Sequence, residues 1–65
     1  MIPEYAHVRI KASGITGVVV DICTTSKGLT VYIVESDEKG VPGGYGDSEY
    51  WKLFNCIESE IEEIK

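Results

Sequence analysis

The chain has 65 residues and a formal net charge of −5, with 43% apolar and 26% charged residues. This length allows one domain with a small core, because a chain of about 60 residues buries only about 60% of its unfolded surface. The composition excludes intrinsic disorder, and no apolar run approaches the roughly 20 residues of a membrane-spanning helix. The first residues lack the layout of a secretion signal, so we expect a cytoplasmic protein.

Charge is distributed unevenly along the chain. Residues 1–34 carry a net charge of +1, whereas residues 35–65 carry a net charge of −6. Nucleic acids and anionic membranes are bound mainly through clustered lysine and arginine side chains. The sequence has no such cluster, so we expect no nucleic acid and no membrane among its partners.

The first predicted strand covers residues 5–11, where side chains alternate between two faces. One face is apolar and consists of Ala6, Val8 and Ile10. The other face is polar and aromatic and consists of Tyr5, His7, Arg9 and Lys11. Such alternation is typical of a strand with one solvated face.

A glycine-containing connection follows, and then a second strand is predicted at residues 17–23. Gly14 and Gly17 allow a tight bend or the close approach of two backbones. Asp21 marks the solvated face of the second strand. We therefore expect its core-facing residues to be Val18, Val20 and Ile22.

The third predicted strand, residues 29–36, is apolar on both faces and follows a turn in which Gly28 is expected to take a positive φ. A doubly apolar strand is either covered on both sides or presents one face to a partner. So short a chain cannot cover both sides of a flat sheet. We therefore expect an all-β fold, a single small barrel that curls around this strand and is closed by the last residues.

A long loop is predicted at residues 36–49, which hold four of the seven glycines. A loop of this length is either mobile or functional. The chain becomes apolar again in a fourth predicted strand at residues 49–56.

Two structures are compatible with the last residues. Ile57, Ile61 and Ile64 are spaced as on one face of a short helix, and Ser59 with Glu62 matches a capping box. The alternative is a 3₁₀ turn at 59–61 followed by a closing strand. We favour the alternative, because a helix of eight residues is marginal in water and a fifth strand would close the barrel.

This succession of elements resembles the small SH3-like β-barrels. The resemblance covers about residues 6–64. Its main motif is the pairing of Gly17-Val18-Val19-Val20 with Tyr32-Ile33-Val34-Glu35, which is similar to the strand pairing in KOW-type modules and in short bacterial families of unknown function. The terminal Ser-Glu-Ile-Glu-Glu-Ile is similar to the turn and final strand of such proteins. The resemblance implies one domain over residues 1–65 with five antiparallel strands and a 3₁₀ turn before the last strand. It also implies a binding scaffold, and such scaffolds serve many functions.

Exposed aromatic residues beside acidic ones form the best candidate binding site. The candidate residues are Tyr45, Tyr50, Trp51, Asp47 and Glu49. Aromatic side chains are enriched at protein interfaces. The alternative is that Trp51, the only tryptophan, closes the core.

Other chemistry has weaker support in the sequence. His7 with Cys23 or Cys56 would supply a thiol nucleophile and a base, but a chain this small offers little room for a substrate pocket. The acidic side chains Asp37, Glu38, Asp47 and Glu49 lack the spacing of a calcium loop, so we expect no metal site and no cofactor.

Three functions remain as hypotheses. The first is a non-enzymatic module that binds a protein partner, or that forms a homodimer through the third strand or the loop at 36–49. The second is an acidic regulator that covers a basic, nucleic-acid-binding surface of a partner. The third is a thiol-based redox or catalytic role through Cys23 and Cys56.

Overall fold

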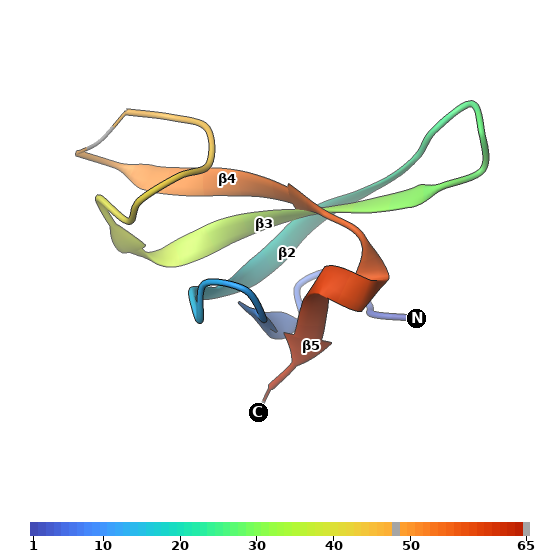
Figure 1. Ribbon diagram of the computed structural model, residues 1–65, viewed down its shortest axis with the longest axis horizontal. Helices are drawn as coiled ribbons and strands as arrows, with labels where there is room; N and C mark the ends of the chain where they lie inside the picture. The colour runs from blue at the N-terminus through green and yellow to red at the C-terminus, as the bar shows by residue number, and fades with distance from the viewer. Residues whose placement is uncertain (48, 65) are drawn as a thin grey trace.

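The computed structural model describes residues 1–47 and 49–64, and these form a single antiparallel sheet of five strands (Figure 1). In chain order the elements are β1 (His7–Ile10), β2 (Thr16–Thr24), β3 (Thr30–Lys39), β4 (Trp51–Cys56), the 3₁₀ turn η1 (Glu58–Glu60) and β5 (Ile61–Glu63). The strand order is β4-β3-β2-β1-β5. The predicted all-β class, the five antiparallel strands and the turn before the last strand are confirmed, and the helical alternative for the tail is wrong.

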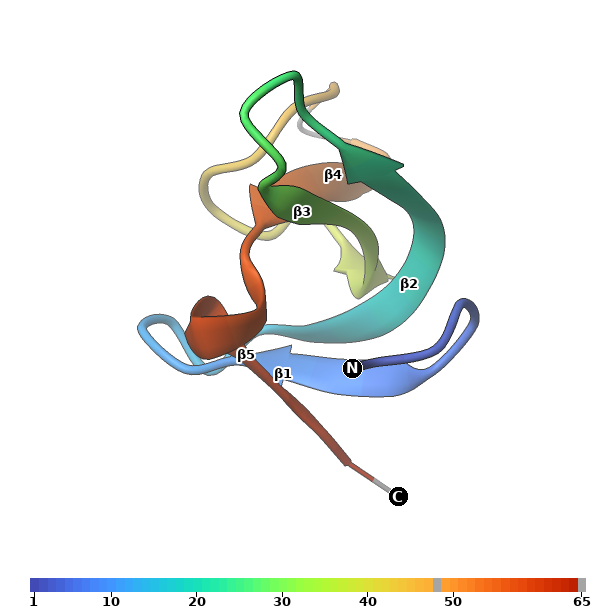
Figure 2. The ribbon, with the colours of Figure 1, turned by 90° about the vertical axis from the view of Figure 1, so that its right-hand side faces the viewer.

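The sheet is strongly curled, and β4 and β5 are its two edge strands (Figure 2). β5 pairs with β1, and Ile61 on β5 is only 3% exposed. The C-terminal segment therefore covers the core, as expected for a sheet that curls around a strand with two apolar faces. The described part of the chain contains no helix that is long and apolar enough to cross a membrane.

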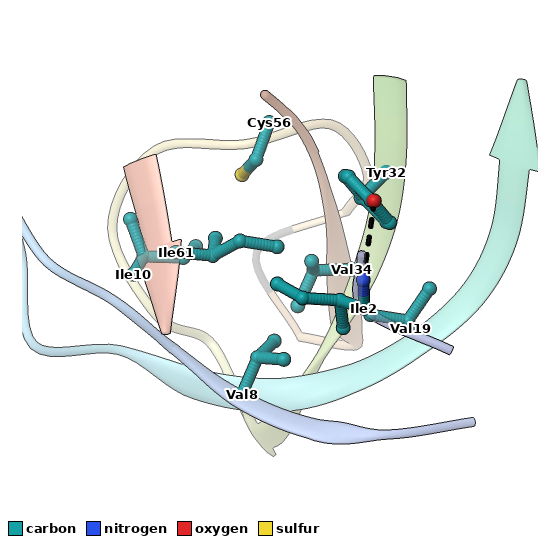
Figure 3. Packing of buried hydrophobic residues seen from close by; sticks show 8 residues of the cluster. All are labelled: Ile2, Val8, Ile10, Val19, Tyr32, Val34, Cys56 and Ile61. Carbon is teal, nitrogen blue, oxygen red and sulfur yellow. Dashed lines mark hydrogen bonds between the residues drawn. The ribbon is translucent and has the colours of Figure 1, made fainter. Parts of the chain in front are cut away.

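The core lies inside this curl and draws on every strand and on the N-terminal segment. Its buried apolar residues are Ile2, Val8, Ile10, Val19, Tyr32, Val34, Cys56 and Ile61 (Figure 3). Tyr32 has no exposed side-chain surface, and its hydroxyl accepts a hydrogen bond from the backbone N–H of Ile2 at 3.3 Å. Tyr32 thus provides the large central side chain while its polar end remains satisfied.

The prediction for the core face of β2 is wrong for two of its three residues. Val19 is fully buried, whereas Val18 and Val20 are half-buried. A bulge between Val19 and Asp21 shifts the alternation, so that Ile22 does pack against the core. An extra residue in one strand moves every side chain after it to the opposite face of the sheet. A run of three valines contains no signal of where such a shift occurs.

Strand β3 is longer than predicted, since it continues to Lys39, and the loop predicted at 36–49 therefore begins four residues later. The pairing of β3 with β4 shifts between Glu35 and Lys39. The buried hydroxyl of Ser36 spans this irregularity. It accepts a hydrogen bond from the N–H of Lys52 at 3.0 Å and donates one to the carbonyl of Glu38 at 2.7 Å.

Candidate functional site

The outer side of β3 and β4 carries several exposed or half-buried apolar side chains, and we call this group the outer aromatic face. It consists of Val31, Ile33, Tyr45, Trp51 and Leu53. Trp51 and Leu53 occupy alternate positions of β4 and are 48% and 38% exposed. Tyr45 lies directly opposite Leu53 in an isolated antiparallel bridge, and directly opposed residues project to the same side of a sheet.

The loop after β3 is folded against β4. Tyr45 and Leu53 exchange two backbone hydrogen bonds of 2.8 and 2.9 Å, and the N–H of Gly40 donates to the carbonyl of Tyr50 at 3.1 Å. Gly44, with φ of 68°, lies so close to β4 that an added Cβ would be 2.9 Å from the carbonyl oxygen of Leu53. Of the two alternatives for this loop, the contacts of its described residues favour a positioned segment over a mobile one.

The expectation that Trp51 closes the core is wrong. The inward positions of β4 belong to Phe54 and Cys56, which leaves Trp51 on the outer side. There the ammonium group of Lys39 lies 4.5 Å from the centroid of the indole ring. Lys39 and Trp51 are register partners across β3 and β4, so the bulge near Ser36 determines this contact.

The remaining predicted site residues lie in the segment directly before β4. Tyr50 is 56% exposed and directly precedes β4, and Asp47 and Glu49 are exposed in the loop. Within residues 1–47 and 49–64, neither Asp47 nor Glu49 forms an ion pair. Glu35, which sequence reasoning missed, is exposed on the same face opposite Leu53. Only the strand register could have revealed it.

The outer side of β1 has a different character, because its charges are paired. Arg9 forms an ion pair with Glu62 of β5, and Nε2 of His7 lies 2.5 Å from Oδ2 of Asp37. The hydrogen bond from His7 lowers the pKa of Asp37. The outer side of the sheet therefore presents paired polar groups at β1, whereas at β3 and β4 it presents apolar side chains next to Glu35.

The structure does not bring the thiol residues into a pair. Cys23 is exposed on β2 opposite Val31, whereas Cys56 is buried on β4 and burial raises the pKa of its thiol. The two cysteines lie on opposite faces with β3 between their strands. His7 pairs with Val18, five residues before Cys23 along β2 and so about 16 Å away along the strand. In the described ranges, no three His, Cys, Asp or Glu side chains are grouped closely enough to hold a metal ion.

A groove lies between β4 and the η1 turn, where the curled sheet remains open. Its volume is about 550 Å³, and its lining includes Ile10, Phe54, Cys56 and Glu60. The free edge of β4 is partly covered, at Leu53 and just after the end of the strand. The backbone of Tyr45 forms hydrogen bonds with both the N–H and the carbonyl of Leu53, and the Glu60 carboxylate accepts a hydrogen bond from the N–H of Ile57 at 2.9 Å. Edge strands blocked in this way are poor templates for another chain.

The fold and this surface define a small all-β domain with one exposed aromatic and aliphatic face. Comparison of the chain with protein-family models, with curated proteins and with solved structures finds no match. The site residues are therefore assigned from the geometry alone.

Proposed function

We propose that the chain is a non-enzymatic interaction module that binds a protein partner through the outer aromatic face. The observation that carries this proposal is the joint exposure of Tyr45, Trp51 and Leu53, at 65, 48 and 38%, on one side of the sheet. Contiguous apolar patches on small domains mark interaction sites, and aromatic residues supply much of the binding energy at interfaces.

The fold supports this proposal, because a small all-β domain can serve as a scaffold for a binding surface. We also propose that it belongs with the SH3-like barrels, because the succession of five strands and a 3₁₀ turn matches what the resemblance implies. The two cysteines are free, which suits a reducing cytoplasm, and we propose that the protein acts there.

Charge favours a different protein over a second copy as the partner. Each copy carries a net charge of −5, and Glu35 and Asp21 lie on the face that a homodimer would bury. Like charges brought together at an interface oppose association. The same carboxylates support the second candidate function, a regulator that covers a basic surface of its partner.

Differential capture from a lysate of the source organism tests the proposal. The bait proteins are the wild type, Tyr45→Ser and Leu53→Ser, with Tyr5→Asn as the control. Tyr5 is 71% exposed outside this face and has a φ of 68°, a conformation that asparagine tolerates.

We expect at least one protein to bind the wild type and the control in stoichiometric amount and to be lost from both face variants. Capture that is equal for all four baits, or that is lost only with the control, would contradict the proposal. Circular dichroism of each bait establishes that the variants are folded.

A further inference from the structure

The indole ring of Trp51 already holds a cation in the free chain. The ammonium nitrogen of Lys39 lies 4.5 Å from the ring centroid, within the distance of about 6 Å at which an aromatic face attracts a positive charge. The two residues face each other across β3 and β4. The ring remains 48% exposed, so solvent and other molecules can reach it.

Carboxylates outnumber ammonium groups in the segments next to this ring. Strand register places Glu35 on this face, and Asp47 and Glu49 are exposed in the segment that precedes Trp51. Lys39 contributes the ammonium group at the ring. A ligand that complements both the ring and the carboxylates must carry positive charge together with apolar surface.

We propose that Trp51 is the recognition site for an arginine or lysine side chain in a basic segment of the partner, and that Lys39 occupies this site until the partner binds. The inference rests on the proposed function and extends it by naming the chemistry that is recognised. Lys39 must leave the ring when the incoming cation binds, so it lowers the affinity for the partner. Arginine is the better ligand, because its planar guanidinium group stacks on an aromatic face.

Titration of the purified ¹⁵N/¹³C-labelled chain, followed by nuclear magnetic resonance, tests this proposal. The probe is an acetylated and amidated Gly-Ser octapeptide with two arginines, and the control peptide has glutamine in place of arginine. Since the chain has one tryptophan, it gives one indole N–H signal. We expect the arginine peptide to shift this signal and to move the ε-methylene signal of Lys39 toward its value away from a ring. The glutamine peptide should do neither.

Two variants with the same loss of charge separate displacement from general electrostatics. Lys39→Met removes the ammonium group that lies over the ring. Lys52→Met removes an ammonium group that follows Trp51 in the chain and projects from the opposite side of β4. We expect Lys39→Met to bind the arginine peptide roughly two- to fivefold more tightly than Lys52→Met, in line with the strength of an exposed cation–π contact.

Three results would overturn the proposal: no binding of the arginine peptide, equal affinities of the two variants, or a Lys39 signal that stays at its ring-shifted value at saturation. The capture experiment distinguishes this failure from failure of the proposed function. If a partner still depends on Leu53 while the two lysine variants behave alike, the module function stands and the cation site does not.

Discussion

The hydroxyl of Ser36 takes the place of a ladder hydrogen bond between β3 and β4, so its removal is expected to destabilise the fold. Ser36 is 2% exposed, and it both accepts from the N–H of Lys52 and donates to the carbonyl of Glu38. In Ser36→Ala, both backbone groups lose their partner. A buried group left unsatisfied costs about 1–3 kcal/mol. Lys52 is half-buried and Glu38 is exposed, so water satisfies part of this loss.

We therefore expect Ser36→Ala to lower the free energy of unfolding by about 2 kcal/mol, a large part of the roughly 3–10 kcal/mol of a domain this size. Urea unfolding followed by circular dichroism measures this change. With a slope of about 1 kcal/mol per molar urea, the midpoint should fall by about 2 M. Because the irregularity at Ser36 places Lys39 opposite Trp51, the ring-current shift of the Lys39 side chain should also decrease.

Ser26→Ala is the matched control, since Ser26 is exposed in the turn between β2 and β3. It should change stability by less than about 0.5 kcal/mol. If Ser36→Ala matches this control, then the Ser36 hydroxyl does not hold the two strands in register and the reasoning is refuted.

Three further changes have defined outcomes. The hydrogen bond from His7 lowers the pKa of Asp37 below 3.8, so its ionised form stabilises the fold above that pH, and the contribution is lost as the pH falls through the lowered pKa. Unfolding free energies measured from pH 7 to pH 2.5 should thus depend less on pH in Asp37→Asn, and an unchanged dependence would contradict this. Gly17→Ala places a Cβ 2.2 Å from the carbonyl oxygen of Glu35, so it should lose its cooperative thermal transition; a melting temperature near that of the wild type would show that the strands can separate there. Ile61→Ala should lower the free energy of unfolding by about 2–5 kcal/mol in urea, and a loss below 1 kcal/mol would mean that β5 does not seal the core.

The sequence predicted the elements more accurately than the faces of the strands. Alternation in β1 identified its inward residues, and the short length of the chain correctly implied a curled sheet closed by its last residues, although the outer face of β3 remains partly exposed. The face of β2 could not be predicted, because Val18, Val19 and Val20 are equally apolar. A bulge that changes which of them is buried depends on pairing with β3.

The candidate site was found only in part for the same reason. Tyr45, Tyr50 and Trp51 were recognised as a cluster from their chemistry and proximity in the chain. Their grouping with Leu53, Glu35 and Lys39 depends on strand register and on the irregularity at Ser36, neither of which leaves a local pattern. The exposure of Trp51 likewise follows from the phase of β4, which a single tryptophan does not reveal.

The exposure of Trp51 before and after partner binding tests the proposed module most directly. The chain is prepared with 5-fluorotryptophan, which labels position 51 alone. The ¹⁹F solvent isotope shift between H₂O and D₂O is then measured for the free chain and for its complex with the captured partner. We expect a large isotope shift in the free chain that falls markedly in the complex. A small shift in the free chain, or one that the partner leaves unchanged, would contradict the assignment of the outer aromatic face as the binding surface.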